Sequence, residues 1–257
     1  MRTLRLILGS LCFIIFGGSL YGQYRLPVDF SGSDSTQITG NLNRFADHWG
    51  LHLGEIPGFV FPADGEFPRI QFYYQQSGGF THQKSRYDGN PPDGITSLGT
   101  FTAMGDVTSN LQLILRYNTL ALENRGAVLN GYGARFRSAV GTDSLHALAI
   151  GVLNQKVADA GNFSANSLDI SFQYGWFLGY WTIRADLAAS FVDGKVDVSG
   201  NSAIGTAHDG RYEHRTIHGG LALYRQYRRI TTGLTLRTNL NIWTLHGTIG
   251  WSLPSNF

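Results

Sequence analysis

The residues of this chain that could bind a ligand or take part in a reaction are charged. They stand at alternate positions in runs whose other positions are mainly apolar. Arg184, Asp169 and Asp186 each stand between aliphatic residues, and Arg237 follows Leu236. Arginine keeps its charge and binds carboxylate or phosphate groups through a planar set of donors. We expect these residues on one polar, inward-facing side: Arg116, Arg135, Arg137, Asp169, Gln173, Arg184, Asp186, His218 and Arg237. Because arginines outnumber aspartates among them, this side is expected to favour a small anionic solute.

A second interpretation of the same residues needs no solute. In a barrel of eight to twelve strands the interior is largely filled by side chains. The charged groups would then satisfy one another, with Gln173 and Asp186 as one predicted contact between neighbouring strands. The sequence leaves both interpretations open.

Some histidines stand next to groups that could support hydrolysis. A metal site needs three or four converging ligands, and no spacing in this sequence provides them. We therefore interpret these histidines as solvated residues and predict no catalytic residue, no metal site and no cofactor. A hydrolase acting on lipid or peptide is the alternative, and its candidate residues are Ser144, His146, His208, Asp209, Glu213 and His214.

Strict alternation of apolar and polar residues predicts the strands that carry these groups. The clearest case is 167–178, followed by Gly179-Tyr180 and a second alternating run from Trp181. If Gly179-Tyr180 is a two-residue hairpin loop, Phe172 pairs with Leu187 and every apolar position meets an apolar one. Arg228-Arg229 gives the same agreement for a second hairpin.

Turn lengths and aromatic residues favour a membrane barrel over a soluble β-sandwich. Short turns alternate with longer ones, as in barrels with short periplasmic turns and long outer loops. Aromatic side chains cluster at the strand ends, where membrane barrels carry girdles. The girdle is predicted from Trp176, Tyr180, Trp181, Trp243 and Trp251. The apolar side of the strands is thus expected to face lipid, and a secreted soluble β-sandwich is a further alternative.

The alternating runs predict ten strands in an up-and-down meander. We expect long outer loops at 81–96 and 199–211. The segment 43–61 alternates in part and would add two strands, for a total of ten to twelve. The expected strands are 68–80, 97–107, 110–122, 128–140, 145–157, 166–178, 181–198, 212–227, 229–238 and 240–253.

The N-terminus predicts export. A basic start, the apolar stretch 6–16 and a small-residue end near Gly22 are typical of a cleaved signal peptide. Its removal takes away Arg2 and Arg5 and leaves 18 basic and 18 acidic residues, so the charge gives no sign of nucleic-acid binding. We divide the chain into a signal peptide (1–22), an N-terminal segment (23–66) and a barrel (67–257). The N-terminal segment lies in the periplasm, plugs the lumen or forms the two additional strands.

With this signal, the meander from Asn110 to Leu253 and the terminal aromatic Phe257, the chain resembles bacterial outer-membrane β-barrel proteins as a broad class. Gln23, directly after the expected cleavage site, is similar to the start of many exported proteins of the Bacteroidetes group. The resemblance implies an all-β, antiparallel transmembrane barrel in the cell outer membrane of a Gram-negative envelope. It also implies outer-membrane lipid and the barrel-assembly machinery as partners. The expected function is non-enzymatic, as a small pore or as a structural or surface-interaction protein.

Overall fold

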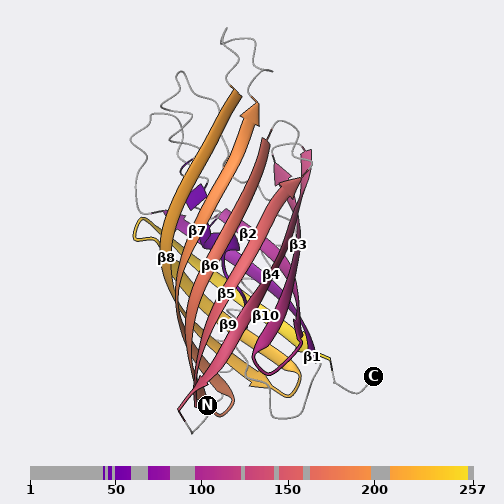
Figure 1. Ribbon diagram of the computed structural model, residues 1–257, viewed down its shortest axis with the longest axis vertical. Coiled ribbons are helices and arrows are strands. Elements are labelled where there is room, and N and C mark those ends of the chain that lie inside the picture. Colours follow the sequence, from indigo (N-terminus) through magenta and orange to yellow (C-terminus); the bar gives the residue numbers. More distant parts are fainter. Residues whose placement is uncertain are drawn as a thin grey trace.

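Ten antiparallel strands form one closed barrel in the computed structural model (Figure 1). The structure describes residues 43, 46–47, 50–58, 69–81, 96–122, 125–141, 145–158, 163–197 and 209–253. Each strand pairs with the next along the chain, and the first pairs with the last, so the described sheet has no free edge. The strands are β1 (Arg69–Thr81), β2 (Thr96–Asp106), β3 (Leu111–Leu122), β4 (Arg125–Val140), β5 (His146–Ala158), β6 (Phe163–Leu178), β7 (Trp181–Asp197), β8 (Asp209–Tyr227), β9 (Ile230–Thr238) and β10 (Ile242–Ser252).

The predicted strands and the two tested registers are confirmed. Every observed strand lies within three residues of its predicted bounds. Phe172 pairs with Leu187 and Gln173 with Asp186 across β6 and β7. The β8–β9 hairpin turns at Arg228-Arg229, as the alternation required. These registers are well determined because a shift of one residue would turn every apolar side chain to the polar side.

The outer surface of the barrel is apolar. Phe172, Leu187 and Leu221 are each more than half exposed on the wall, although they belong to three neighbouring strands. No second sheet covers them within the described chain, so the alternative of a β-sandwich is wrong. An exposed apolar wall of this extent is costly in water but suits the hydrocarbon core of a membrane.

The inner surface is polar and closely filled. Polar and charged residues on all ten strands are buried, among them Gln75, Thr102, Gln112 and Thr248. Thr102, Gln112 and Thr248 each stand next to an exposed apolar residue, which is the two-faced pattern that the sequence carries. The barrel therefore has its apolar surface outside and its polar surface inside, the reverse of a soluble protein.

A stretch of chain before β1 lies inside the barrel. We call residues 50–58 the lumen segment. Residues 43, 46–47 and 50–53 are helical, so the expectation that 43–61 adds two strands is wrong. Leu51, His52 and Leu53 are all buried, because the closed barrel wall surrounds the segment. Within the parts of the chain that the structure describes, no helix is long and apolar enough to cross a membrane.

Several expectations fall outside the described residues. These are the signal peptide (1–22), most of the segment 23–66, the loop 82–95, Ser144, His208 and Phe257. Three other loops are shorter than the predicted strand bounds imply, since β4 begins at Arg125, β6 at Phe163 and β8 at Asp209. Asp193-Gly194, a pair of residues typical of hairpin turns, lies within β7 without turning the chain.

Candidate functional site: the filled lumen

The structure places all nine residues expected on the inner side within the barrel. None of them is more than 9% exposed, and the arginines among them are almost completely buried. Their expected action on a small anionic solute stays a prediction. What the structure adds is their partners, and for four of the arginines these include the lumen segment.

Four inward-facing arginines donate hydrogen bonds to main-chain carbonyls of the lumen segment. These arginines come from β3, β4, β7 and β9, so the lumen segment is bonded to several sides of the barrel wall. A guanidinium group offers five N–H donors and can bind more than one acceptor at a time. The bonds join Arg116 to the carbonyls of Leu53 and Glu55, Arg135 to that of Gly58, Arg184 to that of Ile56 (2.8 Å) and Arg237 to that of Leu51 (2.9 Å).

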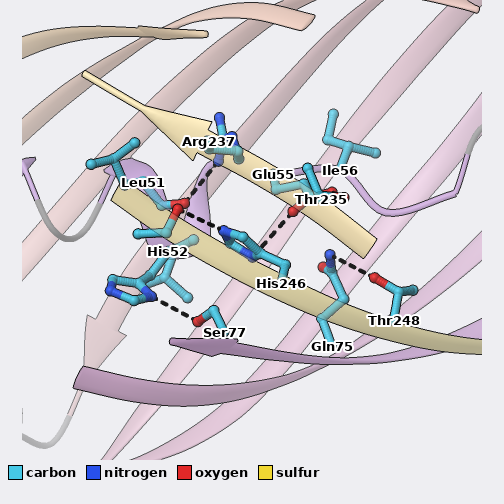
Figure 2. Close-up of polar contacts among 12 residues, drawn as sticks. Leu51, His52, Glu55, Ile56, Gln75, Ser77, Thr235, Arg237, His246 and Thr248 are labelled. Atoms are coloured by element: carbon cyan, nitrogen blue, oxygen red, sulfur yellow. Dashed lines mark hydrogen bonds and ion pairs between the residues drawn. The ribbon is translucent and has the colours of Figure 1, made fainter. Parts of the chain in front are cut away.

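The carboxylate of Glu55 is held by side chains from four neighbouring strands. Its Oε1 accepts hydrogen bonds from Thr235 Oγ1 at 2.7 Å, Arg184 Nη2 at 2.9 Å and the Tyr224 hydroxyl at 3.0 Å. Nδ1 of His246 lies 3.1 Å from Oε2. Figure 2 shows Glu55, Thr235 and His246 gathered in one part of the lumen. Charge-assisted bonds of this kind are about twice as strong as neutral ones.

The surroundings of Glu55 keep its carboxylate ionised. Burial by itself would raise the pKa of Glu55, which belongs to the lumen segment and not to a spanning strand. Attraction to His246 when its ring is protonated, and to Arg184 and Arg237, more than offsets that effect and lowers the pKa to about 2. The lumen segment therefore brings a full negative charge into a lumen rich in arginine.

Apolar contacts and close approach complete the fit of the lumen segment. Ile56 packs in a buried cluster with Tyr73, Met104, Ile114 and Leu153. At Gly54, an added Cβ atom would come within 2.8 Å of the Asp169 carboxylate. His52 Nδ1 lies 2.7 Å from the Ser77 hydroxyl of β1, a contact visible in Figure 2. The segment is thus fitted to the wall by shape as well as by charge.

A second charge cluster is made by the wall alone. Asp106 at the end of β2 accepts from Arg69 Nε at 3.1 Å and from Arg137 Nη2 at 2.7 Å. Gln112 donates to the same carboxylate at 2.8 Å. Its members come from β1 to β4 and are buried. This cluster needs no contribution from the lumen segment.

A serine and a histidine also meet inside the barrel, but not in a catalytic arrangement. Ser190 Oγ lies 2.8 Å from His218 Nε2. A catalytic histidine is oriented by an acid on its other nitrogen. Here the other nitrogen of His218 faces the Arg237 guanidinium, and the acid, Asp169, contacts the serine instead. These residues form a structural network.

The other hydrolase candidates that the structure describes are not brought together. His146 stands at the start of β5, where its Nδ1 contacts the Tyr174 hydroxyl at 3.0 Å. His214 lies within β8, and its Nε2 is 3.0 Å from the carboxylate of Asp47. Among the described residues, no group of three His, Cys, Asp or Glu side chains could hold a metal ion.

The predicted girdle residues lie at the strand ends. Trp176 and Trp181 flank the Gly179-Tyr180 turn, and Tyr180 is 71% exposed. Trp243 and Trp251 stand near opposite ends of β10, and both are exposed. Their contact with the two membrane interfaces stays a prediction.

The sequence did not identify the residues that bind Glu55, nor Glu55 itself. Tyr224, Thr235 and His246 sit on strands whose polar positions were predicted, but their common partner is far away in sequence. One signal was present. Arginines exceeded acids on the inner side, and a buried excess charge calls for a partner from elsewhere.

No protein-family model and no curated protein matches the chain. Among solved structures it is similar to Ail, the attachment invasion locus protein of Yersinia pestis, with 10% identity over 72% of this chain and 99% of that one, at a TM-score of 0.32. The KdgM porin in complex with disordered oligogalacturonate is 6% identical over 71% and 99% of the two chains, at a TM-score of 0.38. The translocator domain of the autotransporter NalP from Neisseria meningitidis is 10% identical over 84% of this chain and 95% of that one, at a TM-score of 0.39.

The apolar outer surface and the polar inner surface of the barrel indicate the environment of the protein. In a membrane every backbone polar group must be satisfied, and among sheets only a closed barrel achieves this. The described sheet is closed, its outside is apolar and its inside is polar. The chain is therefore a transmembrane β-barrel of the outer-membrane type, located in the cell outer membrane, with its lumen filled by residues 50–58.

Proposed function

We propose that the protein is a closed outer-membrane barrel, non-enzymatic, with a structural or surface-interaction role and without an open pore at rest. The observation that carries the proposal is the occupation of the lumen by residues 50–58. Their side chains are almost fully buried, with Leu51 at 0%, Glu55 at 2% and His52 at 4% exposure. A continuous water path along the segment would leave such side chains exposed. Outer-membrane lipid around the wall and the assembly machinery during insertion are its proposed partners.

The hydrogen bonds from the arginines to main-chain carbonyls support a closed lumen and not an open pore for anions. An arginine-lined pore must bind an anion weakly enough to release it. In this lumen Arg116, Arg184 and Arg237 already bond to carbonyls of the lumen segment or to Glu55, so a passing solute would have to displace these bonds. The small-pore function would therefore require the lumen segment to leave.

Conductance in planar bilayers tests this proposal. We expect the wild-type protein to insert without steady conductance. The double variant Arg116→Met, Arg237→Met loses the donors to the Leu53 and Leu51 carbonyls and should show discrete conductance steps. Heat-modifiable gel mobility reports whether that variant is still a folded barrel. A large, ohmic conductance of the wild-type protein would contradict closure.

A further inference from the structure

The donors around Glu55 form a site that belongs to the wall. Arg184, Tyr224, Thr235 and His246 stand on β7, β8, β9 and β10, which follow one another around the barrel. Thr235 and His246 are direct cross-strand partners. The Tyr224 ring lies over Gly233, where an added Cβ atom would come within 2.2 Å of it. A ladder of paired strands therefore fixes the positions of these groups, independently of the lumen segment.

The donor set matches one chemical group. Three donors converge on one oxygen of Glu55, and a ring nitrogen faces the other oxygen. All four side chains are buried, with exposures of 0 to 1% for Arg184, Tyr224, Thr235 and His246. Preorganised donors in a dry site bind a charge far more strongly than they would in water. Three donors on one oxygen, beside a second oxygen that lies 3.1 Å from an imidazole nitrogen and accepts no hydrogen bond among the described residues, fit a carboxylate.

Without Glu55 this site would lack its ligand. Arg184 would keep its contacts with Asp186 Oδ1 at 3.2 Å and with the Ile56 carbonyl at 2.8 Å, but its Nη2 would lose the carboxylate of Glu55. Among the described residues, the hydroxyl groups of Tyr224 and Thr235 would keep only each other, 3.3 Å apart. Buried donors without an acceptor are costly, so the vacant site should tend to take up an anion.

We propose that Arg184, Tyr224, Thr235 and His246 form a binding site for small organic carboxylates, and that Glu55 occupies this site as an internal ligand. The inference rests on the proposed function, in which residues 50–58 close the lumen and are not part of its wall. An incoming carboxylate would compete with Glu55 for the same donors. The lumen segment would then be a built-in competitor of the solute.

Chemical rescue of Glu55→Ala tests this site. The substitution removes a methylene and the carboxylate, which together have nearly the size of acetate. The full chain is refolded from urea into detergent micelles in sodium acetate or, at equal ionic strength, in sodium chloride. We expect a lower urea midpoint than wild type in chloride, and a rise with acetate concentration that saturates as binding to the folded state requires. The wild-type midpoint should not respond in this way.

Three controls make the result specific to a carboxylate at this position. Glu55→Gln fills the space with a neutral isostere, so acetate should not raise its midpoint. Acetamide and sulfate should not rescue Glu55→Ala, because one lacks the charge and the other has a different shape. Adding Thr235→Val to Glu55→Ala removes one donor and should shift the rescue to higher acetate concentration.

Several outcomes would overturn the proposal. One is a Glu55→Ala midpoint that is the same in acetate and chloride, and another is equal rescue by sulfate. If Glu55→Ala folds only in acetate, the proposal is supported. If it folds in neither medium, Glu55→Ser carries the same comparison, and no response to acetate there rejects the site. These assays do not measure conductance, so an open wild-type pore would reject closure without deciding this result.

Discussion

Two buried charge clusters in this barrel are built on different principles. The wall cluster joins Asp106 to Arg69 and Arg137, using only strands β1 to β4. The segment cluster joins Glu55 to Arg184 and its neighbours, and its acid comes from outside the wall. Both are almost fully shielded from solvent, so neither can exchange its partner for water without a rearrangement.

The difference shows which part of the interior depends on the lumen segment. Among the described residues, six buried arginines project from the strands against three buried aspartates. The wall cluster uses one aspartate for two of the arginines. The segment cluster needs the carboxylate of Glu55 and the carbonyls of residues 50–58, because its buried arginines would otherwise carry uncompensated charge. Removing a partner from the segment cluster should therefore open the lumen. Removing a partner from the wall cluster should lower the stability of the barrel without opening the lumen.

Arg184→Met should give the largest effect. It removes the donor to the Ile56 carbonyl and the partner of both Glu55 and Asp186. Breaking a buried ion pair from one side costs about 3–5 kcal/mol. We expect a loss of this size in the free energy of unfolding, measured by urea titration with tryptophan fluorescence. Discrete conductance steps should accompany it in planar bilayers.

A double variant checks that the loss belongs to this cluster. In a Glu55→Gln background, Arg184→Met should cost markedly less, because the charge that Arg184 neutralises is already gone. Equal costs in the two backgrounds would mean that the two side chains are not coupled, and the comparison between the clusters would fail.

Asp106→Asn should give a smaller effect of a different kind. The amide retains one acceptor oxygen but turns an NH₂ group toward the donors of Arg69, Arg137 and Gln112. Leaving these donors poorly paired should cost about 2–3 kcal/mol. The same urea titration measures this loss, while bilayers should show no conductance steps. Steps as frequent as those of Arg184→Met would show that the wall cluster also holds the lumen closed.

The barrel wall could be predicted from the sequence because two environments impose a period of two. Phe172 and Leu187 must face lipid while Gln173 and Asp186 face inward, and only one register satisfies both requirements. The same alternation identified the inward arginines. It identified no partner for them, since pairing across the lumen depends on positions far apart in sequence.

The lumen segment could not be predicted in the same way. Leu51 and Leu53 alternate with His52, which imitates a strand, yet all three are buried in a helical turn because the barrel surrounds them. Amphipathic periodicity distinguishes a buried face from an exposed one, and this segment has no exposed face. The glycines at 50, 54 and 58 were the local signal of close approach, which only the folded wall explains.

Gly54→Ala should give the smallest effect and alter the lumen segment without changing a charge. The added Cβ atom would lie 2.6 Å from the Gly50 carbonyl oxygen and 2.8 Å from Asp169 Oδ1, so the chain or the wall must shift. Overpacking of this kind costs about 1–2 kcal/mol. We expect a lower urea midpoint together with brief, infrequent conductance steps, since the segment is displaced but still held by the arginines.

Gly105→Ala is the matched control for that variant. Gly105 lies in β2, and an added Cβ atom there would meet no atom within 4 Å. Alanine in a strand is expected to be neutral or slightly stabilising relative to glycine. The control should therefore keep the wild-type midpoint and stay closed in bilayers. If Gly54→Ala behaves as Gly105→Ala does, the lumen segment is not closely fitted to the wall, and the contrast between a self-sufficient cluster and a segment-dependent one loses its geometric basis.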